Sequence, residues 1–233
     1  MTRRLGVFGG TFDPVHHGHL DAARAVRSAL DIGEILFVPS KDPPHRSVVP
    51  HASAFHRFAL VGLAISGLDG YRVSDAELLR GGRSYTIDTL GQLHAAGWAP
   101  SQLFFILGTD AFAEIATWRQ FPGVLDAAHF TVIARPGSTV ETALATTPEL
   151  RGRVRTATEP AGPDATGIFV VRATTRDVSS TMIRERIAGG RPIRDLVPAA
   201  VAQHIAAHHL YETEDDLHVQ DQDTQRQNVR EDR

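Results

Sequence analysis

Short apolar runs alternate with segments of helical periodicity along this chain, and that alternation limits the folds it can adopt. Five runs indicate buried strands, at residues 5–8, 35–38, 103–107, 130–134 and 168–171. A weaker extended piece surrounds Val73. Apolar spacing between the runs indicates helices at residues 20–30, 54–65 and 84–96, the last with Ser84 or Thr86 as its N-cap. Strands separated by helices pair in parallel, so the sequence predicts an α/β fold with a doubly wound, mostly parallel sheet of five to six strands and helices on both faces.

The chain divides into one expected domain, residues 1–211, and a tail, residues 212–233. Residues 137–167 are rich in Thr, Ala, Pro and Gly, and we interpret them as a surface excursion with one helix near residues 143–150. A final helix is expected within residues 198–211. The tail carries eight acidic residues against three arginines and few apolar ones, so it cannot bury enough surface to offset the entropy of ordering. We expect it to be disordered.

Composition excludes several classes of protein. The absence of cysteine excludes a disulfide scaffold, a thiolate zinc site and a cysteine nucleophile. Lys41 is the only lysine and follows serine, so the phosphate loop that ends in Gly-Lys is excluded. The longest apolar run, residues 59–65, is too short to cross a bilayer, and the start of the chain does not resemble a signal peptide. We expect a cytoplasmic protein with no membrane or nucleic-acid partner.

A glycine- and histidine-rich segment, residues 9–20, joins the first strand to the first helix. Because ligands of parallel sheets bind at the carboxyl ends of strands, we expect Gly9 and Gly10 to bend the chain sharply and expose amides to an anion. His16 and His19 would then point at phosphates from a helix start. Histidines this close could instead chelate a metal, but no conventional zinc signature surrounds them.

A second segment, residues 178–186, follows the last strand and opens another helix. Ser179 or Ser180 can cap that helix, and the hydroxyls and amides at its start, including Thr181, suit an anion. Arg184 lies one turn further on and could bind a phosphate with two hydrogen bonds. Taken alone, the stretch could equally be an ordinary helix start with a solvated arginine.

Together, the strings GGTFDPVHHGHL and SSTMIR resemble the two signatures of the HxGH nucleotidyltransferase superfamily. The resemblance covers residues 4–211 and is closest to the bacterial nicotinate-nucleotide adenylyltransferase family, supported by residues 38–46, 84–86, 108–110, 117–119, 135–137 and 210–211. It implies His16, His19 and Arg184 as catalytic residues. It assigns ATP and its phosphates to Gly9, Gly10, Thr11, Phe12, Gly108, Asp110, Ser179, Ser180 and Thr181. It assigns nicotinate mononucleotide to Thr86, Trp118, Arg119, Lys41, His45 and Arg46.

For three of these assignments the residues allow another interpretation. Trp118 could be packed in the core, and Asp110 could cap a short helix as well as bind a ribose. Lys41, with His45 and Arg46, could belong to a solvated loop.

The resemblance implies a reaction in which nicotinate mononucleotide attacks ATP to give deamido-NAD and pyrophosphate, with Mg²⁺ carried by the substrate phosphates. No covalent enzyme intermediate is needed. Three alternatives remain open. The first is pantetheine-phosphate adenylyltransferase, the second is an adenylyltransferase that prefers the nicotinamide nucleotide, and the third is a nucleotide-binding sensor without catalysis. Neither the residues nor the resemblance decides whether the chain forms a homo-oligomer.

Overall fold

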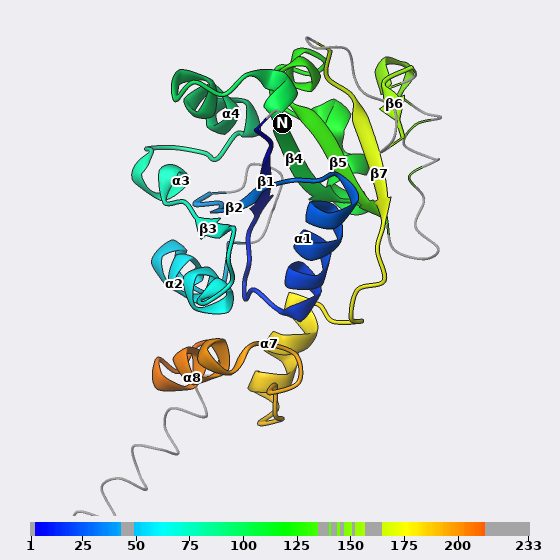
Figure 1. Cartoon of the computed structure of the whole chain (residues 1–233). Coiled ribbons are helices and arrows are strands. Elements are labelled where there is room, and N and C mark those ends of the chain that lie inside the picture. The colour runs from blue at the N-terminus through cyan, green and yellow to red at the C-terminus, as the bar shows by residue number, and fades with distance from the viewer. Residues whose placement is uncertain are drawn as a thin grey trace, which may run out of the picture.

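The computed structural model describes residues 3–42, 49–134, 140, 144, 147–150, 152–156 and 165–212. Its strands are β1 Leu5–Gly10, β2 Glu34–Pro39, β3 Tyr71–Val73, β4 Leu103–Gly108, β5 His129–Ala134, β6 Val154–Arg155 and β7 Ile168–Arg172. They form one sheet in the order β3-β2-β1-β4-β5-β7-β6, with parallel pairing throughout (Figure 1). The doubly wound fold is confirmed.

The predicted strand count was too low. Five runs were identified with a sixth candidate at Val73, and that candidate is β3. The additional strand is β6, which has two residues and pairs with β7 at the edge of the sheet. A strand this short, in a segment rich in Thr, Ala, Pro and Gly, leaves no apolar run in the sequence, and only its pairing with β7 defines it.

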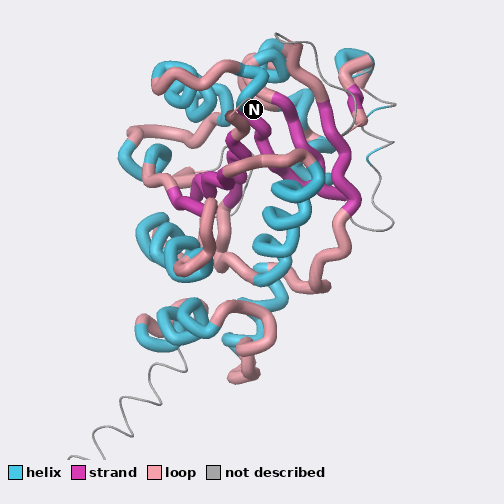
Figure 2. Tube along the Cα trace, viewed as in Figure 1, coloured by secondary structure: helices cyan, strands magenta, loops and turns pink. Residues whose placement is uncertain are grey.

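Helices alternate with the strands along the chain, as expected, and the last two follow β7 (Figure 2). The bounds are α1 His17–Ala29, α2 Ala54–Ile65, α3 Ala76–Leu79, α4 Thr86–Ala95, α5 Thr109–Ala113, α7 Ser180–Ala188 and α8 Ala199–Ala207. Helix α1 begins three residues before the predicted start at residue 20. The backbone N–H of His16 donates to Nδ1 of His19 at 3.2 Å, and this cap stabilises a first turn that contains Gly18. Histidine-containing caps are harder to recognise in a sequence than Ser, Thr or Asp caps.

Alternate residues of the central strands face opposite layers, and this gives the molecule two cores. In β4, Phe104 and Ile106 belong to the core beneath α1, α2, α7 and α8. Phe105 and Leu107 belong to the core on the other face, which also contains residues of α4 and α5. A strand buried on both faces appears in the sequence as a continuous apolar run, which is why β4 was readily identified.

The chain reverses its direction of winding beside β1. Strands β2 and β3 extend the sheet on one side of β1, and the chain then returns to add β4 on the other side. Ligands of open parallel sheets bind outside the carboxyl ends of the strands at such a point. The starts of α1 and α7 both lie at this end of the sheet in Figure 1, where α7 lies below α1.

Three expectations concern the less regular parts of the chain. Of the helix expected near residues 143–150, the structure describes a 3₁₀ turn, Pro148–Leu150, and residue 144, and the rest lies outside the described residues. The expected final helix is α8, and the chain then turns toward Tyr211. The acidic tail from residue 213 also lies outside the described residues.

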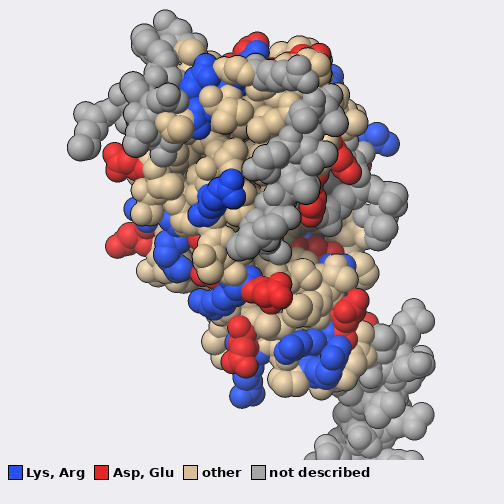
Figure 3. Space-filling model, turned by 90° about the vertical axis from the view of Figure 1, so that its right-hand side faces the viewer, with Lys and Arg blue, Asp and Glu red and all other residues tan. Residues whose placement is uncertain are grey.

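Basic and acidic side chains are interspersed on the face shown in Figure 3, as is usual for a solvated surface. Among the described residues, no helix has the length and apolar character needed to cross a membrane.

Candidate active site

A cavity of about 920 Å³ opens at the carboxyl ends of β1 and β4. It is lined by both sequence motifs and by the starts of α4 and α5. The predicted site residues in its lining are Gly9, Gly10, Thr11, Phe12, His16, His19, Thr86, Gly108, Asp110, Trp118, Arg119, Ser179, Ser180, Thr181 and Arg184. Lys41 is not part of the lining, although its neighbour Ser40 is. His45 and Arg46 lie outside the described residues.

The glycine pair does not form the sharp bend that was expected. Gly9 and Gly10 are the last two residues of β1. A Cβ atom at Gly9 would lie 2.8 Å from Cζ of Phe105, and one at Gly10 would lie 2.9 Å from Cζ of Phe12. Aromatic rings therefore occupy the space that side chains would need. The chain turns at Phe12, whose φ of 51° is unusual for a residue other than glycine.

The two histidines predicted to be catalytic form a stacked pair at the start of α1. His16 is the N-cap, and its ring centroid lies 3.7 Å from that of His19. Because Nδ1 of His19 accepts the backbone N–H of His16, the neutral His19 ring carries its proton on Nε2. A Cβ atom at Gly18 would lie 3.1 Å from Nδ1 of His16, so glycine between the histidines gives the His16 ring its space.

The second motif packs directly onto the loop that follows β1. Ser179 caps α7 by accepting the backbone N–H of Met182 at 3.1 Å, as predicted. Oγ of Ser180 donates to the carbonyl oxygen of Pro14 at 2.8 Å. The Arg184 guanidinium donates to the carbonyl oxygen of Asp13 at 2.7 Å and to Oγ1 of Thr181 at 3.2 Å. The two helix starts are thereby held against the same part of the cavity.

Asp13 is a central residue that the sequence analysis did not single out, although it lies within the first motif. Its carboxylate accepts the backbone N–H groups of His51 at 2.8 Å and Ala52 at 3.1 Å, and the hydroxyl of Tyr211 at 2.9 Å. Burial and the neighbouring Asp13 raise the pKa of Tyr211, so this phenol remains a hydrogen-bond donor. Asp13 thus connects the loop after β1 to the end of the described chain.

Arg57 is a second residue that was missed. It lies in α2 with only 1% of its surface exposed, and its guanidinium donates to the carbonyl oxygens of Thr11 at 2.7 Å and Ser40 at 2.6 Å. Burial lowers the pKa of Arg57, and the negative charge of Asp13 opposes that shift. The sequence signal that could have revealed Arg57 is a charged residue directly before the apolar run at residues 58–61, in a predicted helix.

The other end of the cavity is formed by the start of α4. Neither Ser84 nor Thr86 caps this helix, contrary to the prediction, because Tyr85 is the N-cap residue and makes no side-chain cap bond. Oγ of Ser84 instead accepts the backbone N–H of Lys41 at 3.0 Å, which fixes the loop after β2 beside α4. Thr86 is the first helical residue, a position at which a backbone amide has no acceptor within its own helix.

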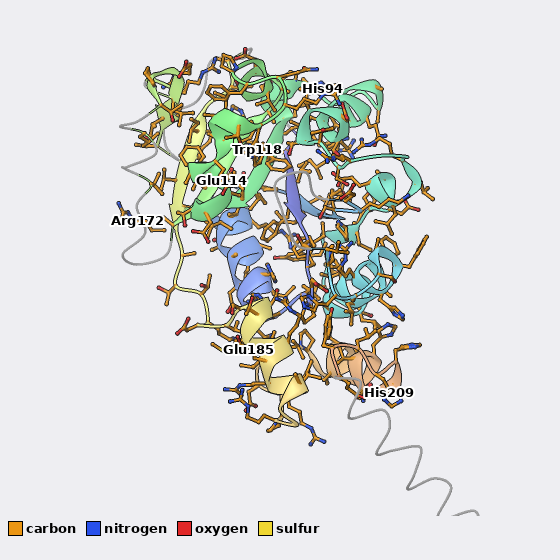
Figure 4. All side chains as sticks on the ribbon, turned by 180° about the vertical axis from the view of Figure 1, so that it is seen from behind. His94, Glu114, Trp118, Arg172, Glu185 and His209 are labelled. Carbon is orange, nitrogen blue, oxygen red and sulfur yellow. The ribbon has the colours of Figure 1, made fainter. Side chains whose placement is uncertain are left out.

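Trp118 and Arg119 complete this end. The Trp118 ring is half-buried and packs edge-on against Phe105 and Phe130, with centroids 5.9 and 6.2 Å away. It therefore combines core packing with a place in the cavity lining; Figure 4 shows it close to Glu114, which also lines the cavity. The Arg119 guanidinium lies 4.7 Å from the ring centroid of Tyr85 and 3.4 Å from the Asp88 carboxylate.

Two acidic residues of the lining differ in their surroundings. Asp110 is exposed and is the second residue of α5, whose N-cap residue is Gly108, so the capping alternative is wrong. Glu77 is buried, was not singled out from the sequence, and accepts the Oγ1 hydroxyl of Thr89 at 2.5 Å. Burial raises the pKa of Glu77, while the hydrogen bonds from Thr89 and Ser84 oppose that shift. Glu77 connects α3 to the start of α4 beneath the cavity.

Comparisons with known proteins agree with this geometry. The chain matches the cytidylyltransferase-like family over residues 7–186. It is 42% identical over 213 residues to a probable nicotinate-nucleotide adenylyltransferase of Pseudomonas fluorescens, covering 91% of this chain and 98% of that protein. It is 37% identical over 213 residues to a protein of the same name from Citrifermentans bemidjiense, covering 89% of this chain and 98% of that protein.

A solved structure has the same fold. The nicotinic acid mononucleotide adenylyltransferase of Plasmodium falciparum complexed with NaAD superposes with a TM-score of 0.66, covering 90% of this chain and 98% of that one. The two sequences are 17% identical, so this likeness supports the fold and leaves the residue roles to the geometry of the cavity.

Proposed function

The chain belongs to the nicotinate-nucleotide adenylyltransferase family, and we propose that it transfers the adenylyl group of ATP to nicotinate mononucleotide, forming deamido-NAD and pyrophosphate in NAD biosynthesis. One observation carries the proposal. A single cavity has two helix starts, two histidines and an arginine at one end, and an aromatic ring beside a helix start at the other. The first end suits phosphates, and the second suits an aromatic carboxylate.

The phosphate end would act by positioning and by neutralising charge. A phosphate oxygen of the mononucleotide attacks the α-phosphorus of ATP, the bond to the β-phosphate oxygen breaks, and pyrophosphate leaves. His16, His19 and Arg184 would stabilise the negative charge on the transferring group and on pyrophosphate, together with Ser179, Ser180 and Thr181 at the start of α7. The close packing of Arg184 and Ser180 onto residues 13–14 supports this assignment, because it fixes the donors before substrate binds.

Magnesium fits this site as part of the ATP substrate. The described side chains around the phosphate end are chiefly nitrogen and hydroxyl donors, whereas Mg²⁺ prefers oxygen ligands. The carboxylate of Asp13 already accepts two backbone amides and a phenol. We therefore propose that ATP enters as its magnesium complex, with the ion held mainly by substrate phosphates and water.

The pyridine end would select the acid form of the nucleotide. Trp118 would stack on the ring, and backbone groups at Thr86 and Arg119 would receive the carboxylate. We further propose that Asp110 accepts ribose hydroxyls beside Gly108, and that Lys41, His45 and Arg46 approach the mononucleotide phosphate. Two carboxylate oxygens match these donors, whereas the amide offers one acceptor and turns its NH₂ group toward other donors.

The test is a pyrophosphate-release assay with ATP and, in turn, nicotinate mononucleotide, nicotinamide mononucleotide and phosphopantetheine. A mispaired buried donor costs about 1–3 kcal/mol, so kcat/KM should favour the acid over the amide by about tenfold to a hundredfold. Equal values for acid and amide would refute the carboxylate site. If phosphopantetheine were the only acceptor that reacts with ATP, the chain would be a pantetheine-phosphate adenylyltransferase. If no acceptor reacted, the chain would be a nucleotide-binding sensor without catalysis.

The remaining parts of the proposal concern the chain as a whole. We propose that residues 1–211 form one catalytic domain that works in the cytoplasm, and that the acidic residues 212–233 take no part in the reaction. The cavity supports the first point, since residues from β1 to α7 complete it.

A further inference from the structure

Three histidines lie where α8 packs against α2, outside the lining of the cavity described above. His56 lies in α2, His204 lies in α8, and His208 is the residue that ends α8. One ring nitrogen from each lies within 4.8 Å of the others. None of the three contributes to the lining of the cavity, and the proposed reaction gives them no role.

The spacing of these nitrogens suits a transition metal. Nδ1 of His56 and Nε2 of His204 are 3.1 Å apart and share a hydrogen bond, which a metal ion would replace. Two nitrogens that bind one tetrahedral zinc ion at about 2.0–2.1 Å are separated by about 3.3 Å, so this pair is already close to the required geometry. Two histidines four residues apart on a helix, such as His204 and His208, also face one ion from successive turns.

His208, the third ligand, needs only a small rotation of its ring to reach the same ion. The ring centroids of His204 and His208 are 4.3 Å apart, and those of His56 and His208 are 4.9 Å apart. His208 is exposed, so its ring can turn toward the pair without disturbing the core. Three imidazoles with water in the fourth position coordinate zinc in catalytic zinc sites, so three histidines are enough to hold the ion.

We propose that His56, His204 and His208 bind one zinc ion that joins α8 to α2. The join has a structural consequence, because the chain beyond His208 reaches Tyr211, whose hydroxyl donates to Asp13 in the loop that follows β1. An ion between α2 and α8 would hold His208 in place, and with it the start of the segment that leads to Tyr211. Figure 4 shows α8 with the labelled His209 at the opposite end of the molecule from Trp118.

The experiment uses the full chain, stripped of metal with a chelator and titrated with Zn²⁺ against a chromophoric zinc indicator. We expect one tightly bound zinc per chain and a rise in the melting temperature on binding. Cobalt in place of zinc should give the visible absorption of a tetrahedral site. His208→Ala removes an exposed ligand and should weaken zinc binding by more than about 100-fold, since losing even an outer-shell partner of a ligand costs 10–100-fold.

The matched control is His209→Ala, which removes the neighbouring exposed histidine, whose partner is Glu212. It should bind zinc as the unaltered chain does. His204→Ala is a second ligand variant and should behave like His208→Ala. The proposal is overturned if the chain does not bind zinc at one per chain, or if both ligand variants bind it with unchanged affinity, because the ion would then lie elsewhere, for example at His16, His17 and His19.

Discussion

The two ends of the cavity are held together by different kinds of contact. At the phosphate end, hydrogen bonds join groups far apart in the sequence: Ser180 to Pro14, Arg184 to Asp13, and Tyr211 to Asp13, over 166, 171 and 198 residues. At the pyridine end, Arg119 lies over Tyr85 and pairs with Asp88, and its side chain and that of Asp88 are 51% and 35% exposed.

The difference indicates that the phosphate end is held more rigidly than the pyridine end. Donors that stabilise a transferring phosphoryl group act best when they are fixed before the reaction, and the partly buried, long-range hydrogen bonds at the phosphate end fix them. Exposed ion pairs contribute about 0–1 kcal/mol because water screens them. The shape of the pyridine end therefore depends mainly on the packing of Trp118 against Phe105 and Phe130.

The largest expected effect comes from matched aspartate substitutions at the two ends. Asp13→Ala leaves two backbone amides, of which that of Ala52 is buried, and the Tyr211 hydroxyl without their acceptor, and it removes the negative charge beside buried Arg57. It should lower the free energy of unfolding by about 3–5 kcal/mol. Asp88→Ala removes only an exposed partner and should lower it by about 0.5 kcal/mol. Urea unfolding measures both, and similar losses would remove the distinction between the ends.

His19→Ala tests whether the phosphate end of the cavity catalyses adenylyl transfer. Removing one preorganised donor should lower kcat by about 10²–10³-fold, with a stability loss of about 1 kcal/mol from the lost cap. His17→Ala is the matched control, because His17 belongs to the same turn but does not line the cavity. Steady-state kinetics and thermal unfolding are the measurements. A fully active His19→Ala enzyme would contradict the assignment.

Trp118→Ala tests the pyridine end in the same assay. Stacking on an aromatic side chain contributes about 1–3 kcal/mol of binding free energy. Its loss should therefore lower kcat/KM roughly tenfold to a hundredfold for both the acid and the amide nucleotide. The ratio between the two substrates should hardly change, because the proposed carboxylate donors remain. A collapse of that ratio with unchanged kcat/KM for the amide would show that Trp118 itself distinguishes the two.

His129, which is 3% exposed at the start of β5, gives the smallest effect and serves as a reference outside both ends. Its Nε2 donates to the carbonyl oxygen of Ser101, and its Nδ1 accepts the backbone N–H of Gly167. Burial lowers the pKa of His129, so the unfolded chain binds this proton first, near pH 6.5. Stability should therefore fall as the pH drops below about 6.5.

In His129→Gln, the fall in unfolding free energy between pH 7 and pH 5 should be smaller than in the unaltered chain, and kcat at pH 7 should be unchanged. Urea unfolding at several pH values measures the slope. An identical slope in both proteins would show that this histidine does not contribute to it.

The sequence by itself determined the fold class and most of the proposed site. Strands such as β4 are buried on both faces, so their apolar runs are visible without any partner. His16, His19, Ser179 and Arg184 lie in short contiguous strings that start helices, and the chemistry of a helix start is local. The local patterns identified each string, and the resemblance of the two strings to the superfamily signatures brought these residues into one hypothesis.

Tertiary structure decided what depends on contacts between distant segments. The two-residue strand β6 exists through its pairing with β7, and the Asp13–Tyr211 bond requires α8 to pack beside α2. Arg57, Glu77 and the three histidines His56, His204 and His208 likewise acquire their partners only when helices and loops pack together. A sequence pattern records the period of one element, and it does not record which polar groups two packed elements will share.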